Sequence, residues 1–112
     1  MSKLEEGQAI LKALGLPDKQ QTTLAAHILL ALGDVLPGTP WKEAKSRDIG
    51  IHAMIQFISD HYGKRYAENS RESFRKNVLR PLEQARIVDK NRDDPSRATN
   101  SMHNKYCLSE AA

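Results

Sequence analysis

The sequence has a single cysteine, few aromatic residues and no long hydrophobic run. With Cys107 alone, no disulfide can form within the chain and no site with several cysteine ligands exists. The longest apolar stretch, residues 24–32, is interrupted by His27 and is much shorter than the roughly 20 residues of a membrane span. The first residues lack the basic-then-apolar order of a signal peptide. These absences argue against secretion, membrane insertion and a disulfide-stabilised fold, and they favour a soluble cytoplasmic protein.

The charge of the chain is unevenly distributed. Its 112 residues are enough for one domain, and the net charge is +3. Residues 1–62 contain six basic and seven acidic side chains, whereas residues 63–112 contain eleven basic and seven acidic ones. A basic second half predicts a polyanionic partner, with nucleic acid as the first candidate. The alternative is a basic helix face that is simply solvated.

Apolar residues recur at helical spacing in three segments of the first half. The expected helices cover residues 3–14, 21–32 and 51–62. A glycine follows each segment, at the position where helices commonly end. Two prolines and a glycine make residues 36–40 a loop, and we expect Trp41 to fill the core beside it.

A fourth helix should begin at Asn69. The Asn69 side chain can cap the first turn while Glu72 reaches back to it, as in a capping box. Its apolar residues repeat every four positions, at Phe74, Val78 and Leu82. Pro81 has no N–H to donate and its ring clashes with a carbonyl of the preceding turn, at a cost of about 3 kcal/mol in a helix interior. We therefore expect a kink or break near residues 79–80.

Two short extended segments close the chain, over residues 86–89 and 105–108, with a long polar loop over residues 91–101 between them. Three helices followed by such a hairpin are typical of a winged helix-turn-helix. We therefore expect a mainly α fold: a winged helix-turn-helix with a three-helix core, a C-terminal two-stranded β-wing and an extra N-terminal helix. Residues 1–16 would form the N-terminal helix and residues 17–112 the winged-helix DNA-binding domain.

The fourth helix offers basic and polar side chains opposite its apolar stripe, as a helix that reads the DNA major groove must. Arginine is the common bidentate reader of guanine. Base contacts are expected from the first turns of this helix, by Asn69, Ser70, Arg71, Ser73 and Arg75. Phosphate contacts are expected from the helix, the turn before it and the wing, by Lys64, Arg65, Lys76, Arg80, Lys90, Arg92 and Arg97.

Several stretches of the chain resemble the N-terminal domain of BsuBI/PstI-type type II restriction endonucleases. They are NSRESFRK at 69–76, YGKRY at 62–66, DDPSR at 93–97, NS at 100–101, ILKALGLP at 10–17 and PGTPW at 37–41. The likeness covers nearly the whole chain. Two positions depart from the family pattern: Arg86 stands where a glycine is expected before the wing, and Pro81 where the helix usually continues.

The resemblance implies a function as well as a fold. It implies a winged helix that recognises double-stranded DNA, joined in the parent protein to a separate C-terminal nuclease domain that depends on Mg²⁺. It further implies a palindromic CTGCAG-type target and a homodimer. The parent protein would then be a site-specific deoxyribonuclease of a bacterial restriction-modification system, while this chain would hold no cofactor and face no membrane.

The chain itself shows no convincing catalytic or metal site. Asp34 with Glu43 and Lys45 matches the loose acid and Asp/Glu-x-Lys pattern of metal-dependent nucleases, but no apolar strand carries the triplet. His103 and Cys107 have the i, i+4 spacing of zinc ligands only if their segment is helical, and it is predicted to be extended. We therefore expect no catalytic residue and no metal ligand in this chain.

Two other functions remain open from the sequence. A free-standing winged-helix transcription regulator would bind an operator without belonging to a nuclease. A winged helix can also serve as a protein-interaction module, in which case the basic helix would face an acidic partner and bind no duplex.

Overall fold

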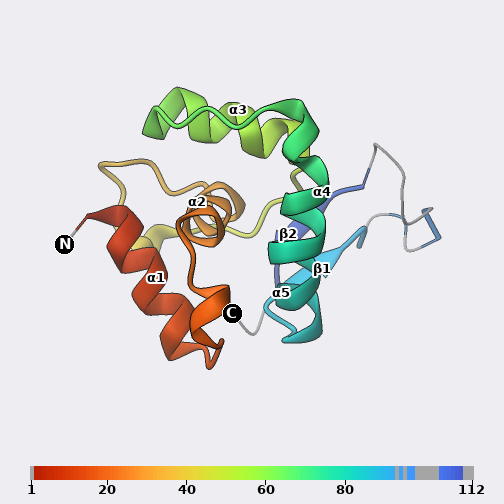
Figure 1. The fold of residues 1–112 in the computed structure, drawn as a ribbon, viewed down its shortest axis with the longest axis horizontal. Helices are drawn as coiled ribbons and strands as arrows, with labels where there is room; N and C mark the ends of the chain where they lie inside the picture. The colour runs from red at the N-terminus through yellow and green to blue at the C-terminus, as the bar shows by residue number, and fades with distance from the viewer. Residues whose placement is uncertain (1, 93, 95, 98–103, 110–112) are drawn as a thin grey trace.

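The computed structural model describes residues 2–92, 94, 96–97 and 104–109. Figure 1 shows α2 in the middle of the molecule, with α1, α3 and a second long helical segment arranged around it and a β-hairpin beside that segment. The helices of the first half are α1 (Lys3–Ala13), α2 (Thr23–Leu32) and α3 (Ile51–Tyr62), with short 3₁₀ turns η1 (Asp18–Gln20) and η2 (Trp41–Glu43). The second half contains η3 (Glu68–Ser70), α4 (Arg71–Ser73), η4 (Phe74–Leu79), α5 (Arg80–Gln84), β1 (Val88–Lys90) and β2 (Tyr106–Leu108).

The predicted helices of the first half are confirmed, and their ends have clear local causes. At the start of α1, Ser2 and Glu5 form a capping box, because each side chain accepts a hydrogen bond from the other residue's backbone N–H. The Thr22 side chain accepts from the Ala25 N–H at the start of α2. At the end of α3, Gly63 adopts a φ of +68°, the left-handed conformation that glycine takes without a Cβ clash.

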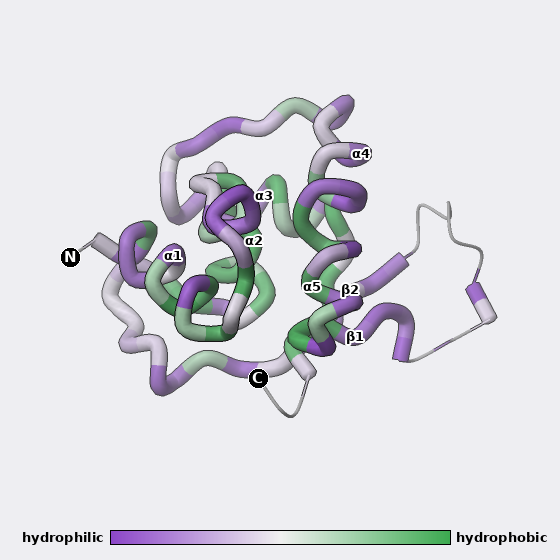
Figure 2. Tube along the Cα trace, turned by 60° about the horizontal axis from the view of Figure 1, so that its bottom comes forward, coloured by the Kyte–Doolittle hydropathy of each residue, from purple (hydrophilic) through white to green (hydrophobic). Residues whose placement is uncertain are grey.

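The core is built around α2. Every residue from Ala25 to Leu32 is buried, so this helix is covered on all sides. It contacts α1, α3, η4 and β2. Figure 2 shows the hydrophobic colour concentrated in α2, while the helical segment that follows α3 alternates between hydrophobic and hydrophilic turns. This second segment therefore has one face for the core and another for solvent.

Helix α1 belongs to the same core. Leu11 is fully buried, and Gly7 lies so close to α2 that a Cβ added to it would come within 3.2 Å of the Ala26 Cβ. Trp41 is half-buried and packs against the core near the same glycine, as expected. The division of the chain at residue 16 stays a prediction, although the two parts share one hydrophobic cluster.

The segments α4, η4 and α5 form one uninterrupted helical path over residues 71–84, here called helix 71–84. The predicted stripe is confirmed, because Phe74, Val78 and Leu82 are buried, and Leu79 is buried beside them. The middle of the helix is widened into a π-helix, in which the Arg80 N–H bonds to the carbonyl of Arg75. A wider turn changes the backbone partners just before the proline. The chain thus reaches Pro81 without a break and resumes as an α-helix with the proline in its first turn.

The predicted capping box at Asn69 is wrong. Asn69 lies inside the 3₁₀ turn η3, and no side chain caps the start of α4. The Glu72 carboxylate instead accepts hydrogen bonds from Arg75. The strong pull of a guanidinium on a carboxylate explains why Glu72 points along the helix and not back to its start.

The wing forms where the sequence predicts it, with a third element added. Strands β1 and β2 are antiparallel, and Val88 pairs with Leu108. Ile49, just before α3, extends the ladder through a bridge to Tyr106 in which each N–H bonds to the other carbonyl at 2.9 Å. Arg86 adopts a φ of +61°, so it occupies the conformation in which a glycine is expected. The structure thus confirms a mainly α winged helix-turn-helix with an extra N-terminal helix. No helix in the described part of the chain is both long and apolar enough to cross a membrane.

Candidate nucleic-acid interface

The residues predicted to contact bases gather at the start of helix 71–84 and in the 3₁₀ turn before it. Asn69 and Ser73 are exposed and Ser70 is half-buried. The side chains of Arg71 and Arg75 are 28% and 24% exposed, so each is partly covered and partly open to solvent. The structure therefore brings this set together on one end of a helix.

Both arginines of this set have acidic partners three residues before them. Arg75 donates from Nη2 to both Glu72 carboxylate oxygens, at 2.7 and 2.8 Å. Arg71 lies 3.8 Å from a Glu68 oxygen, and Glu68 also pairs with His52 of α3. Residue Glu72 was not predicted as part of the site, because its spacing from Asn69 suggested a cap.

Tyr106 on β2 lies near enough to helix 71–84 for the charges of that helix to act on its hydroxyl. Tyr106 is fully buried, and its hydroxyl finds no hydrogen-bond partner among the described residues. Burial and the Glu83 carboxylate raise the pKa of Tyr106 to about 12, although the nearby arginines pull it down. The phenol is therefore neutral at physiological pH and is part of the hydrophobic core.

The cations predicted to contact phosphate lie along the exposed face and the preceding turn. Lys76 and Arg80 are exposed, as their position opposite the buried stripe requires. Lys64 and Arg65 are exposed in the turn after α3, and the Lys64 ammonium lies 5.6 Å from the centre of the Tyr66 ring. The Tyr66 ring in turn packs edge-on against Phe74, with 5.4 Å between ring centres. This turn is thereby attached to helix 71–84 through aromatic contacts.

Two of the wing cations, Arg92 and Arg97, are held by side-chain hydrogen bonds. Arg92 donates from Nε to Asp48 at 2.9 Å, which ties the wing to the segment before α3. Arg97 donates to the Asn91 side-chain oxygen at 3.0 Å, and Lys90 is half-buried on β1. Part of the predicted polar loop, residues 98–101 included, lies outside the described residues.

A cleft beside helix 71–84 adds a cation that sequence analysis missed. It measures about 450 Å³ and lies between the η1 turn, the start of α2 and the π-helical part of helix 71–84. Lys19 and Lys76 line it from opposite elements, together with the Asn77 side chain. Lys19 is 57 positions from Lys76 in the sequence, so no local pattern could have joined the two.

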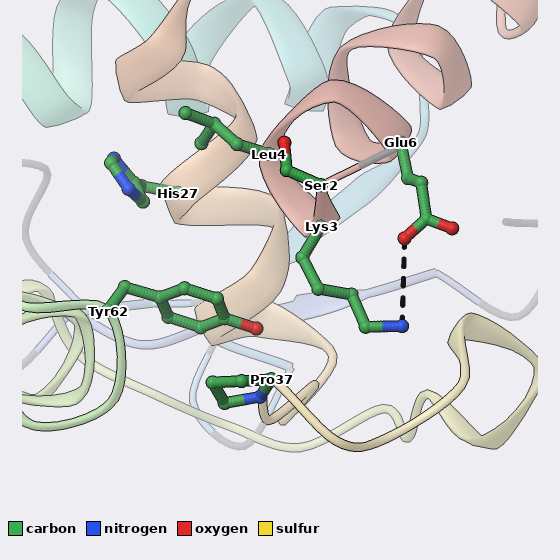
Figure 3. Close-up of a pocket in the computed structure, with 7 residues that line it drawn as sticks. All are labelled: Ser2, Lys3, Leu4, Glu6, His27, Pro37 and Tyr62. Atoms are coloured by element: carbon green, nitrogen blue, oxygen red, sulfur yellow. Dashed lines mark ion pairs between the residues drawn. The ribbon is translucent and has the colours of Figure 1, made fainter.

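A larger cleft of about 690 Å³ has its polar groups engaged in the fold. It is lined by Ser2, Lys3, Leu4, Glu6, His27, Pro37 and Tyr62 (Figure 3). The Tyr62 hydroxyl donates to the Val35 carbonyl at 2.6 Å, and His27 Nδ1 lies 2.9 Å from the Tyr66 hydroxyl. Burial and the nearby Lys64 charge lower the pKa of His27, which favours its neutral form. These contacts are those of packing side chains.

The nuclease-like triplet is gathered but is not carried by a strand. Asp34, Glu43 and Lys45 line one cleft of about 550 Å³. Glu43 ends the η2 turn, and the Asp34 carboxylate lies 3.4 Å from the Arg47 guanidinium. No group of three or more His, Cys, Asp or Glu side chains suited to a metal ion occurs within the described residues. Cys107 is a buried strand residue, and His103 lies outside the described part of the chain.

Comparison with known proteins agrees with this geometry. The family model described as the BsuBI/PstI restriction endonuclease HTH domain matches residues 1–112. The chain belongs to this family. It is therefore a DNA-binding helix-turn-helix domain of the kind found in type II restriction enzymes.

Individual relatives show the same relationship. The chain is 43% identical over 100 residues to the type II restriction enzyme BsuBI of Bacillus subtilis, covering 89% of the chain and 32% of that enzyme. It is 34% identical over 102 residues to the type II restriction enzyme AplI of Arthrospira platensis, covering 91% of the chain and 31% of that enzyme. The structure of SdaI restriction endonuclease superposes with a TM-score of 0.92 at 32% identity, over 97% of this chain and 34% of that one. The chain thus spans about a third of the length of each relative.

Proposed function

We propose that this chain is the sequence-reading module of a type II restriction endonuclease, and that it reads the DNA major groove with the first turns of helix 71–84. The observation that carries the proposal is the placement of Arg71 and Arg75, each with a partly exposed side chain, in the first turns of a helix that packs its apolar stripe on the core. A major groove about 12 Å wide admits one such helix. The two guanidinium groups match the paired N7 and O6 acceptors of guanine, and Asn69 can pair with adenine.

Phosphate contacts would position this helix on the duplex. Lys76 and Arg80 flank its exposed face, Lys64 and Arg65 precede it, and the wing cations follow it. Lys19 extends this basic surface across the neighbouring cleft. Such contacts carry no base sequence information but fix the orientation of the protein on DNA.

The remaining part of the parent protein would perform the cleavage. Because the chain spans about a third of each relative, we propose that a C-terminal nuclease domain dependent on Mg²⁺ follows it. A palindromic target of the CTGCAG type would be bound by two copies, since the two-fold symmetry of such a site matches that of a homodimer.

Titration of labelled duplexes tests the proposal. Fluorescence anisotropy should show that a CTGCAG duplex binds more tightly than a scrambled one, and that both weaken with salt. If all seven predicted phosphate contacts form, the slope of log K against log salt is about −6, at −0.9 per phosphate. Equal binding to both duplexes would remove this target while leaving DNA binding in place. Absence of binding to either duplex at low salt would overturn the proposal in favour of a protein partner.

A further inference from the structure

The Glu72–Arg75 pair places an exposed carboxylate beside an arginine of the proposed reading surface. The Arg75 guanidinium donates to Glu72 through three contacts, two from Nη2 at 2.7 and 2.8 Å and one from Nε at 3.3 Å. The Glu72 side chain is 63% exposed, against 24% for Arg75. The carboxylate therefore stands further into solvent than the arginine that it holds.

The position of Glu72 disfavours a purely structural role. An exposed ion pair adds little to the stability of a fold. The pKa of Glu72 is lowered mainly by the hydrogen bond from Arg75, with further help from the charges of Lys76 and Arg80, so the carboxylate is ionised at neutral pH. A fixed negative charge among the cations of a DNA-binding face repels phosphate, and it weakens binding that depends on phosphates alone.

We propose that Glu72 is a specificity-determining residue, which orients Arg75 toward guanine and accepts a hydrogen bond from a cytosine N4 amino group. This inference rests on the proposed function. In the major groove a guanine offers two acceptors and a cytosine offers one donor, so the fixed Arg75–Glu72 pair matches both kinds of base. A duplex without a cytosine at this position leaves the carboxylate facing an acceptor or a phosphate. Binding to that duplex is penalised, which increases the difference in affinity between targets.

Glu68 provides a matched comparison on the same surface. It stands three residues before Arg71, as Glu72 stands three residues before Arg75, and it is 56% exposed. Glu68 also pairs with His52, which ties it to α3. Its longer separation from arginine, 3.8 Å, leaves Arg71 less firmly oriented. Removing the charge of Glu68 therefore changes the net charge by the same amount without removing the proposed base contact.

The test selects tightly bound duplexes from a randomised pool with the 112-residue chain and with its E72Q, R75A and E68Q variants. Each variant is first checked by thermal unfolding, and E72Q should melt with the wild type because the side chain is exposed. We expect the wild type and E68Q to enrich the same motif. We expect R75A to lose the preference for guanine at one position of the motif. We expect E72Q to lose the preference for cytosine at a position that is next to that guanine or paired with it. Discrimination is measured as the dissociation constant for a scrambled duplex divided by that for the best duplex. This ratio should be at least about fivefold smaller for E72Q than for the wild type, mainly because E72Q binds the scrambled duplex more tightly.

Two outcomes overturn the inference, and they differ in what else they remove. In the first, E72Q enriches the wild-type motif at every position, and its dissociation constants for both duplexes change by the same factor as those of E68Q. Glu72 then acts only through net charge. In that case the proposed function stands. In the second, the wild type enriches no motif. The proposal that this chain reads DNA sequence is then wrong, and so is the inference about Glu72 that rests on it.

Discussion

At the scale of single residues, Arg86 shows how the chain enters its wing without the glycine that the family pattern suggests. Its φ of +61° places a side chain with a Cβ in the left-handed region, which costs about 1–2 kcal/mol. Backbone contacts hold it there: the Arg86 N–H bonds to the Glu83 carbonyl at 2.9 Å, and its own carbonyl accepts from the Ser109 hydroxyl at 2.8 Å. The path predicted for a glycine is thus kept by hydrogen bonds.

This strain gives a stability prediction. Arg86→Gly should raise the free energy of unfolding by about 0.5–1 kcal/mol, because the removed strain exceeds the extra chain entropy of glycine. Denaturation by urea measures the change. Gln84→Gly is the control, since Gln84 is the exposed last residue of α5 and its replacement should lower the free energy of unfolding by less than about 1 kcal/mol. A loss of stability of similar size in both variants would show that Arg86 is not strained.

At the scale of elements, the sequence predicts helices better than the joints between them. Helix α3 occupies its predicted residues, because a continuous apolar stripe and Gly63 define both its face and its end. The start of helix 71–84 was mispredicted, since Asn69 and Glu72 fit a local cap pattern that the Arg75 guanidinium outcompetes. The bridge from Ile49 to Tyr106 joins residues far apart in the chain, and no local signal could indicate it.

The candidate site was predicted in part for the same reason. Arg71 and Arg75 follow from helical periodicity, which places them beside a stripe that the sequence shows directly. Lys19 does not, because only the packing of η1 against helix 71–84 brings it to Lys76. Glu72 is visible in the sequence, but its role depends on which of two nearby partners it binds.

The buried side chain of Asn91 joins the two arms of the wing through hydrogen bonds. Asn91, with a φ of +51°, donates to the Asn104 side-chain oxygen at 2.8 Å and accepts from the Lys105 N–H at 2.7 Å and from Arg97. Asn91→Ala should lower the free energy of unfolding by about 2–3 kcal/mol, because these bonds are lost while the left-handed conformation remains.

The exposed Asn77 provides the comparison for this prediction. Asn77→Ala should change the free energy of unfolding by less than about 0.5 kcal/mol. Hydrogen exchange of the β1 and β2 amides should show faster opening of the hairpin in Asn91→Ala alone. Unchanged exchange in that variant would mean that the strands, and not Asn91, hold the wing.

At the scale of the whole molecule, core and charge are supplied by different halves of the chain. The first half provides α2, which every other main helix contacts, and the second half provides most of the cations. Helix 71–84 belongs to both systems, since one face is buried against α2 and the other carries Lys76 and Arg80. The two paired arginines lie half-buried between these faces. Association with DNA should therefore leave the core undisturbed and rearrange mainly side chains on this surface.

The most direct test of the account asks whether Arg75 contacts a guanine in the major groove. Replacing guanine by 7-deazaguanine removes the N7 acceptor from the groove and leaves base pairing intact. The replacement is made at the position where Arg75→Ala no longer prefers guanine. There it should weaken wild-type binding by about tenfold, a free-energy loss within the 1–3 kcal/mol expected of a bidentate arginine contact. In Arg75→Ala the same replacement should have no further effect, because the partner is already absent. If both proteins respond equally, or if the wild type does not respond, helix 71–84 does not read the groove through Arg75.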